Sequence, residues 1–240
     1  MNLRRISLPL VLLTLTACPP PPVVVPEVDS GIPEVKAPVG AVAPAALDFP
    51  QALCGVAGTK DVTVSNTGTA ALTVSASTGT SSVFSVSPAT ATVAAGQSQK
   101  FTVTATVAAT AAAGADFTGV LTLTTNDAAG KKDVALTAKA TGVTLTLTPS
   151  VASFGVLPVN TPSPGLPLTL TNTGNLEATV SLSQPMDSQF SLEWLVGQPA
   201  GFPLAPGQSV ASLRAGFTPV RITPASTSAA IGIAEAICGT

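Results

Sequence analysis

The residues with the clearest chemistry lie near the start of the chain, in the run Leu15-Thr16-Ala17-Cys18. A basic pair, Arg4-Arg5, precedes an apolar stretch over residues 6–16, and a small residue stands directly before the cysteine. This order predicts a secretory signal peptide over residues 1–17, whose removal leaves the cysteine at the new N-terminus. The stretch is shorter than the roughly 20 apolar residues that span a bilayer as a helix. The alternatives are a buried helix and a secretory signal that is cut elsewhere.

Leu15, Thr16, Ala17 and Cys18 together resemble the lipobox of bacterial lipoproteins. That resemblance implies that the Cys18 thiol receives a diacylglycerol and that its freed amine receives a further acyl chain. Two or more chains hold a protein stably at a membrane. Pro19 follows the cysteine. An Asp at this position would resemble an inner-membrane retention signal of enterobacteria, and the chain does not have it. We therefore expect a lipid anchor in the outer membrane, with the protein facing the periplasm or the cell surface.

The rest of the chain carries few groups that catalyse reactions. It has no histidine and no tyrosine, and charged residues make up 9 % of it, which removes the commonest general base and neutral metal ligand. We expect no enzyme activity, no metal and no cofactor. Asp127 and Asp133 are candidates for a Ca²⁺ site, but two carboxylates without further ligands favour hairpin capping. A net charge of −2 without a basic cluster argues against nucleic acid as a partner.

The elements that follow are a linker and then strands. Residues 18–44 are rich in proline and predict an extended stalk after the acylated cysteine. From Leu47 onward, short runs alternate apolar and hydroxyl-bearing residues and are separated by clusters of Gly, Pro, Asn and Ser, as in Asp61–Ser65 and Leu168–Thr171. A period of two with one apolar face is typical of strands that are half buried. The sequence therefore predicts an all-β protein.

The strand region repeats itself at nearly constant spacing. Three short motifs recur in the same order: Val64–Gly68 as Leu170–Gly174, Phe84-Ser85 as Phe190-Ser191, and Gly96–Ser98 as Gly207–Ser209. Ordered repeats of this kind indicate two copies of one domain, which we place at residues 45–142 and 143–240. The shared Asn-Thr-Gly predicts a turn between strands, because Asn and Gly tolerate positive φ.

Several of these motifs resemble one family. They are Leu47-Asp48-Phe49, Val62–Gly68, Phe84–Pro88, Ala95–Ser98 and Gly119–Asp127, and they look like the immunoglobulin-like ASH/hydin domain, whose bacterial copies are often labelled choice-of-anchor D. The resemblance implies tandem seven-stranded antiparallel β-sandwiches used for assembly and protein contact, with no catalytic residues. Such motifs specify a fold far better than a function.

The second copy departs from the pattern twice. Its apolar alternation after Gly207 is one residue out of step with the first copy, which a β-bulge would restore. More seriously, residues 228–234 match the penultimate strand, and no counterpart of residues 133–138 follows them. Either the chain is truncated, or residues 143–148 cover the edge locally, or a partner peptide completes the sheet by adding a strand.

With Cys18 assigned to the lipid, Cys54 and Cys238 are left as a pair. One lies before the first turn of copy one and the other after the penultimate strand of copy two, and these two sites face each other in tandem sandwiches. Compartments outside the cytoplasm permit disulfides, and this one would contribute on the order of 4 to 5 kcal/mol by loop entropy. The alternative is two separate thiols.

One aromatic residue and one insertion are candidates for a binding surface. Trp194, the only tryptophan, alternates onto one face with Phe190 and Leu192, which favours core packing over an exposed aromatic that contacts a sugar or a protein. The insertion that follows carries glycine and proline, and variable loops on a rigid sandwich often form binding sites. The candidate surface is Trp194, Gly197, Pro199 and Gly201.

Together these features predict a membrane-anchored envelope lipoprotein that is not catalytic and serves as a structural or protein-binding module. Its expected partners are the membrane, through the lipid, and a protein whose identity the residues do not indicate. The alternatives are an accessory subunit of an envelope complex that a partner strand completes, and a carbohydrate-binding surface module.

Overall fold

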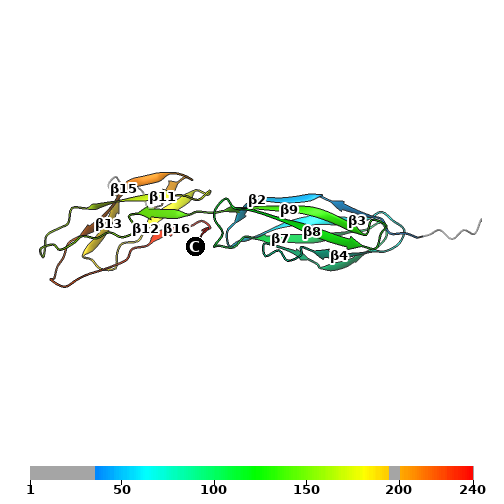
Figure 1. Ribbon diagram of the computed structural model, residues 1–240, viewed down its shortest axis with the longest axis horizontal. Coiled ribbons are helices and arrows are strands. Elements are labelled where there is room, and N and C mark those ends of the chain that lie inside the picture. Colours follow the sequence, from blue (N-terminus) through cyan, green and yellow to red (C-terminus); the bar gives the residue numbers. More distant parts are fainter. Residues whose placement is uncertain (1–35, 195–200, 240) are drawn as a thin grey trace, which may run out of the picture. The chain divides into compact units, whose positions relative to one another are not determined.

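The computed structural model describes residues 36–194 and 201–239. Within these ranges the chain forms strands and turns and no helix (Figure 1), and so none of the described residues belongs to a helix that could span a membrane. The all-β prediction is confirmed. The expected signal peptide, the tetrad that ends at Cys18 and most of the expected stalk lie outside the described residues.

The first sandwich packs a four-stranded sheet, in the order β1-β3-β7-β5, on a five-stranded sheet, in the order β2-β9-β8-β4-β6. Neighbouring strands are antiparallel except β2 and β9, which are parallel. The strands are β1 (Gly40–Ala43), β2 (Ala46–Leu53), β3 (Ala57–Asn66), β4 (Leu72–Ser77), β5 (Phe84–Ser87), β6 (Thr90–Val93), β7 (Ser98–Thr106), β8 (Asp116–Thr125) and β9 (Lys131–Thr141).

The second sandwich packs a four-stranded sheet, in the order β10-β11-β15-β13, on a three-stranded sheet, in the order β14-β12-β16. The strands are β10 (Leu145–Thr148), β11 (Leu166–Asn172), β12 (Ala178–Leu182), β13 (Phe190–Trp194), β14 (Phe202–Leu204), β15 (Ser209–Phe217) and β16 (Ile231–Ile233). Immunoglobulin-like sandwiches are thus present twice, as expected.

The alternation that predicted the strands also determines the core. Val62 and Val64 of β3 are fully buried, and Leu168 and Leu170 of β11 take the same places in the second copy, while the hydroxyl residues between them are more exposed. β-branched and hydroxyl residues suit such half-buried strands. One continuous cluster fills the first sandwich, whereas two smaller clusters fill the second.

One strand count and one boundary differ from the prediction. The first sandwich has nine strands in its two sheets rather than seven. β1 lies inside residues 18–44, which we expected to be linker, and pairs with β3 so that Gly40 faces Asn66. Residues 40–43 alternate between half-buried and exposed, so this short strand contributes to the sandwich although prolines surround it.

The repeated Asn-Thr-Gly turn is held by the buried amide of its asparagine. Asn66 Nδ2 donates to the carbonyls of Ala70 and Val93 at 2.7 and 3.0 Å, and Asn66 Oδ1 accepts from Gly68 N at 3.0 Å. Asn172 makes the corresponding three bonds in the second copy, at 2.8, 2.9 and 3.0 Å. Since both asparagines are buried, each amide satisfies backbone groups that would otherwise lack partners.

The glycine of this turn is needed for a close backbone contact and not for the positive φ that we expected. The motif lies between two strands as predicted, but none of the four residues Asn66, Gly68, Asn172 and Gly174 has the positive φ that we expected. A Cβ on Gly68 would collide with the backbone of residues 37–39, and a Cβ on Gly174 with that of residues 142–144. Glycine is required here because an incoming segment of backbone crosses directly over the turn.

The two departures of the second copy have different outcomes. The β-bulge is confirmed, because the pairing of β11 with β15 shifts between Leu168 and Leu170, which restores Leu213 to the core. The proposed cover of the open edge is wrong. β10, which occupies residues 145–148, pairs with β11 in the opposite sheet rather than with β16.

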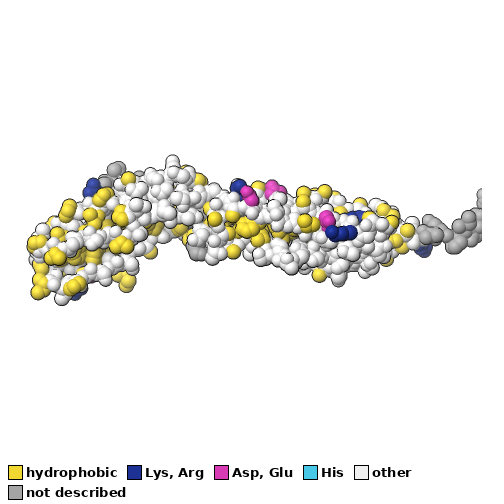
Figure 2. Space-filling view, in the orientation of Figure 1, with side chains coloured by type: hydrophobic (Ala, Val, Ile, Leu, Met, Phe, Trp, Pro, Cys, Tyr) yellow, Lys and Arg dark blue, Asp and Glu magenta, His cyan; other side chains and the backbone are white. Residues whose placement is uncertain are grey.

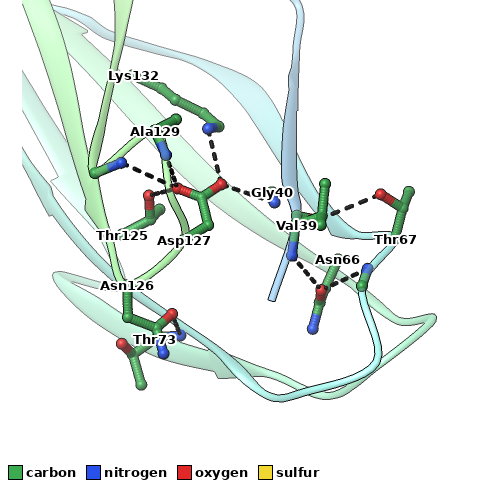
Figure 3. A network of polar contacts seen from close by, with 12 residues as sticks. Val39, Gly40, Asn66, Thr67, Thr73, Thr125, Asn126, Asp127, Ala129 and Lys132 are labelled. Carbon is green, nitrogen blue, oxygen red and sulfur yellow. Dashed lines mark hydrogen bonds and ion pairs between the residues drawn. The ribbon is translucent and has the colours of Figure 1, made fainter. Parts of the chain in front are cut away.

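A buried carboxylate joins β1 to the hairpin between β8 and β9 (Figure 3). Asp127 Oδ2 accepts from Gly40 N and from Lys132 Nζ, each at 2.9 Å, and Oδ1 accepts from Thr125 Oγ1 at 2.8 Å and from Gly130 N at 3.1 Å. Burial raises the pKa of Asp127, but the hydrogen bonds from Lys132, Thr125 and the two backbone N–H groups outweigh it and hold this pKa well below its usual range. Hairpin capping by Asp127 is confirmed.

We expect Asp127→Ala to lower the free energy of unfolding by about 3 kcal/mol, because it leaves the half-buried ammonium of Lys132 and the Gly40 N–H without their acceptor. Denaturant unfolding of the full chain measures this loss. The folded-state pKa of Asp127 is below the unfolded one, so its contribution is present above about pH 4 and disappears as the pH falls further. The difference in the free energy of unfolding between wild type and variant should therefore become smaller in acid.

Asp116→Ala is the matched control. Asp116 lies on β8 and pairs with Lys139 at 3.3 Å, but its side chain is 74 % exposed, against 5 % for Asp127. Exposed pairs contribute about 0–1 kcal/mol. Equal losses in the two variants would contradict a special role for the buried carboxylate.

Candidate binding groove in the second sandwich

The two sandwiches differ most in the surroundings of one strand, β9. In the first sandwich β9 lies between β2 and β8, parallel to the former and antiparallel to the latter (Figure 1). In the second sandwich the described residues contain no strand equivalent to β9. The segments that would flank it are present, but they are not strands.

The first flanking segment is residues 151–155. Leu145 of β10 pairs with Asn172 as Gly40 of β1 pairs with Asn66. Counting forward from these equivalent strands places Ala152 at the position of Leu47, and Phe154 at that of Phe49, in β2. The segment is therefore the second copy's β2, without the strand that β2 pairs with.

The second flanking segment is residues 225–229. Leu182 of β12 pairs with Ile231 of β16 as Ala76 of β4 pairs with Leu123 of β8. Counting back from Ile231 places Ala229 at the position of Leu121. The last three residues of the second copy's β8 remain paired as β16, while the part that would pair with β9 does not form a strand.

The backbone of both segments is open. Among the described residues, no backbone–backbone hydrogen bond involves residues 151–157 or 225–229, whereas β2 and β8 are paired with β9 along most of their length. Free N–H and C=O groups beside each other can pair with a further strand. Within the described part of the chain, the two segments thus present two unpaired edges.

A groove of about 550 Å³ lies between these edges. Its sides are residues 149–155 and 225–229, and Leu168, Leu192 and Ala215 line it as well. All the side chains that line the groove are apolar or carry only a hydroxyl. Figure 2 shows hydrophobic side chains on the second sandwich, at the left of the view. The volume is in the range of ligand sites.

An aromatic pair common to both copies shows the effect of the missing strand. Phe49 and Phe84 lie 6.2 Å apart between ring centroids in the first copy, and Phe154 and Phe190 lie 6.1 Å apart in the second. The first pair is 6 % and 2 % exposed, while the second pair is only half buried and lines the groove. Phe217 stacks on Phe190 at 4.6 Å. The same pair is therefore covered in one copy and open in the other.

The predicted surface around Trp194 is only partly described. Trp194 is half buried, and its ring meets that of Phe202 edge-on at 4.8 Å, which is the core-packing alternative. Gly197 and Pro199 lie outside the described residues. Gly201 has a φ of 81° beside Thr179 and does not line the groove. Of these four residues, none contributes a described side chain to the groove.

The other candidate groups show ordinary structural roles. Asp133 is half exposed and pairs with Lys131 at 3.0 Å, whereas Asp127 pairs with Lys132. The two carboxylates thus have different partners. Gly96 and Gly207 both have positive φ at the entrance to a strand, as expected of turns. Among the residues that the structure describes, no group of three His, Cys, Asp or Glu side chains could hold a metal.

The two cysteines and a second asparagine hold the junction between the copies. Cys54 and Cys238 are joined by a disulfide with 5.4 Å between their Cα atoms, and Cys238 N donates to Val143 O at 2.9 Å. Asn175 Nδ2 donates to Ala140 O at 2.9 Å, and its Oδ1 accepts from Gly142 N at 3.0 Å. Sequence reasoning paired the cysteines but missed Asn175, whose only signal is its place beside the repeated turn.

Comparisons with known proteins agree with the fold. Residues 41–141 match the family described as HYDIN/CFA65/VesB-like, Ig-like domain. No curated protein sequence matches the chain.

Three solved structures share a low level of similarity with the chain. The ASH/PapD-like domain 7 of human CEP192 is 12 % identical, with 57 % of this chain and 97 % of that one covered and a TM-score of 0.37. SSP-19, an MSP-domain protein of Caenorhabditis elegans, is 15 % identical, with 40 % and 96 % covered and a TM-score of 0.33. The YadV chaperone is 12 % identical, with 81 % and 91 % covered and a TM-score of 0.36. At these TM-scores the likeness carries no functional information.

Removal of the disulfide should destabilise the chain. For the 184 residues that separate Cys54 from Cys238, the loop-entropy model gives a loss of about 5 kcal/mol. Denaturant unfolding of Cys54→Ser, Cys238→Ser and the double variant measures it. Because either single substitution breaks the bond, the double variant should lose no more than each single one. Additive losses, or free thiols in the wild type by non-reducing mass analysis, would contradict the bond.

Proposed function

Because the first sandwich is an immunoglobulin-like domain of the ASH/hydin type, we propose that the chain is a protein-binding module of the bacterial envelope that catalyses no reaction. In this proposal an acylated Cys18 anchors the chain in the outer membrane, and the proline-rich stalk separates the folded part from the lipid. The first sandwich is a closed support, and the second sandwich binds the partner.

One observation carries the proposal: among the described residues, an apolar groove and two segments without backbone–backbone hydrogen bonds lie on the second sandwich, at the place that corresponds to β9 of the first. Unpaired backbone groups beside apolar side chains are the surface to which another polypeptide binds by pairing. The groove lacks charged side chains, which favours a partner that brings apolar groups over one that brings charges.

The chemistry of the chain supports a role without catalysis. It contains no histidine and no tyrosine, and the most strongly perturbed carboxylate among the described residues, that of Asp127, is engaged in hydrogen bonds within the first sandwich. A catalytic acid or base must be free to reach a substrate. The aromatic residue that a carbohydrate-binding module would expose, Trp194, packs against Phe202 instead.

The anchor rests on the sequence alone. The basic start, the apolar stretch and the small residue before Cys18 support processing and acylation. Pro19 supports the outer membrane over the inner one, and both the periplasm and the cell surface are compatible with it. A lipid anchor would keep the second sandwich within reach of envelope proteins.

Site-specific photocrosslinking in the native cells tests this function. A photoreactive amino acid in place of Ala229, on the edge of the groove, should give a discrete adduct with another protein. Thr124 is the control position, because it is exposed on β8 but lies in the closed sandwich. The proposal predicts adducts from position 229 and none from position 124.

The same cells test the anchor. Labelling with an alkyne fatty acid should mark the wild type and fail to mark Cys18→Ser. If position 229 gave no adduct in envelopes where the labelled protein is present, or the same adducts as position 124, the second sandwich would not be the binding part.

A further inference from the structure

A smaller pocket lies on the outer face of the four-stranded sheet of the second sandwich. It holds about 210 Å³, and the residues that line it include Arg214 and Gly216 of β15, Ser191 and Glu193 of β13, and Ser163 of the loop before β11. Since side chains alternate along a strand, these strand residues point away from the core. We propose that the pocket binds the carboxylate group of a small ligand and that Arg214 holds it. This site does not depend on the proposed function.

The guanidinium of Arg214 has incomplete partners. Its Nη1 donates to Gly165 O at 2.9 Å, and its Nε is buried without a hydrogen-bond partner. None of the ion pairs between described residues involves Arg214. A cation that is partly removed from water and lacks hydrogen bonds is unfavourable. A bound anion would lower that cost.

The first sandwich shows how this position differs between the copies. Thr102 takes the place of Arg214 there, and its hydroxyl donates to Asp61 at 2.8 Å. Pro167 takes the place of Asp61 in the second sandwich, because it is the residue that pairs with Arg214. The second copy therefore has a cation where the first has a hydroxyl, and it lacks the carboxylate that faces this position.

A further difference between the copies provides the space. Gly216 of the second copy takes the place of Thr104 of the first. A Cβ on Gly216 would lie 2.5 Å from Ser191 Oγ, so a side chain here would enter the space beside this hydroxyl. One water molecule takes about 30 Å³ of the liquid. The pocket therefore has room for a carboxylate and a few further atoms.

Hydroxyl groups add hydrogen-bond donors beside the guanidinium. Ser163 Oγ accepts from Phe217 N at 2.9 Å, which leaves its own proton to donate. Ser191 and Thr218 also line the pocket. A carboxylate has two oxygens that accept hydrogen bonds, and the planar guanidinium matches it better than a point charge does. The set of donors thus fits a carboxylate.

Glu193 restricts the charge of the ligand. It lies opposite Arg214 in the pairing of β13 with β15 and lines the same pocket. Its side chain is exposed, and these two described residues form no ion pair. One cation beside one carboxylate does not balance a dianion, because the second negative charge is repelled. A monoanionic carboxylate is therefore favoured over a phosphate.

Arginine-selective NMR of the full chain in detergent tests the site, with propionate as the probe. Beyond residue 17 the sequence has two arginines, Arg214 and Arg221, and Arg221→Lys assigns their Nε–H signals. At constant ionic strength the Arg214 signal should shift saturably, with a Kd of about 1–10 mM. Arg221, which pairs with Asp187 at 3.8 Å, is the internal control and should not shift. Propionamide, which lacks the charge, should move neither signal.

Variants of the protein test the position of the ligand. Gly216→Thr gives the second copy the residue of the first, fills the pocket and should weaken propionate binding at least tenfold. Glu193→Gln should strengthen it about threefold, because a like charge beside the ligand is removed. Thr104→Ala, in the first sandwich, is the matched control and should leave the affinity unchanged.

The source of the carboxylate is tested with acetyl-trialanine. Binding at least tenfold tighter than that of propionate, lost when the C-terminus is amidated, would assign the carboxylate to a polypeptide. Equal or weaker binding would assign it to a small free acid.

Three results would overturn the inference. The first is no saturable shift of the Arg214 signal up to about 100 mM propionate, or an equal shift of the Arg221 signal. The second is undiminished binding by Gly216→Thr, which would remove the ligand from this pocket. The third is a change of the Arg214 signal in Glu193→Gln without ligand, together with no propionate binding by the wild type, which would make Glu193 the partner of Arg214.

Discussion

A strand inside a sandwich must have its backbone hydrogen bonds satisfied on both sides, and β9 meets this requirement for two neighbours at once. In the first copy it pairs with β2 and with β8. In the second copy no described strand takes its place, and residues 151–155 and 225–229, which correspond to parts of β2 and β8, are not strands. The two small cores, the half-exposed aromatic pair and the apolar groove all follow from that one difference.

The rest of the second copy is held by interactions that do not depend on β9. Asn172 binds two backbone carbonyls from inside the sandwich, and Asn175 holds the residues just before β10. The disulfide fixes Cys238, which lies five residues beyond the end of β16. Stability is therefore uneven within this sandwich, and the segments with the fewest bonds are those beside the groove. Segments of low local stability often form binding sites.

The sequence predicted the features that depend on local pattern. Alternation of apolar and hydroxyl residues in runs such as Asp61–Ser65 predicted the strands, and the repeat predicted the two copies. The bulge in β15 was also predictable, because it restores Leu213 to the core. These succeed because the side chain's face depends only on its position along the strand.

Features that depend on distant contacts were not predictable in the same way. Ala152–Phe154 matches a strand of the first copy in pattern, yet it is not a strand, because no described segment pairs with it. Gly68 and Gly174 are needed for the approach of a distant backbone and not for a positive φ. Asn175 acts on residues that precede it by more than thirty positions, which no local pattern records.

Amide hydrogen exchange of the full chain without any ligand measures how open the groove is. The amides of residues 151–155 and 225–229 should exchange nearly as fast as unstructured peptide, while those of β2 and of the first half of β8 should be strongly protected. Equal protection of the equivalent segments in the two copies would mean that the second sandwich closes by itself and has no open groove.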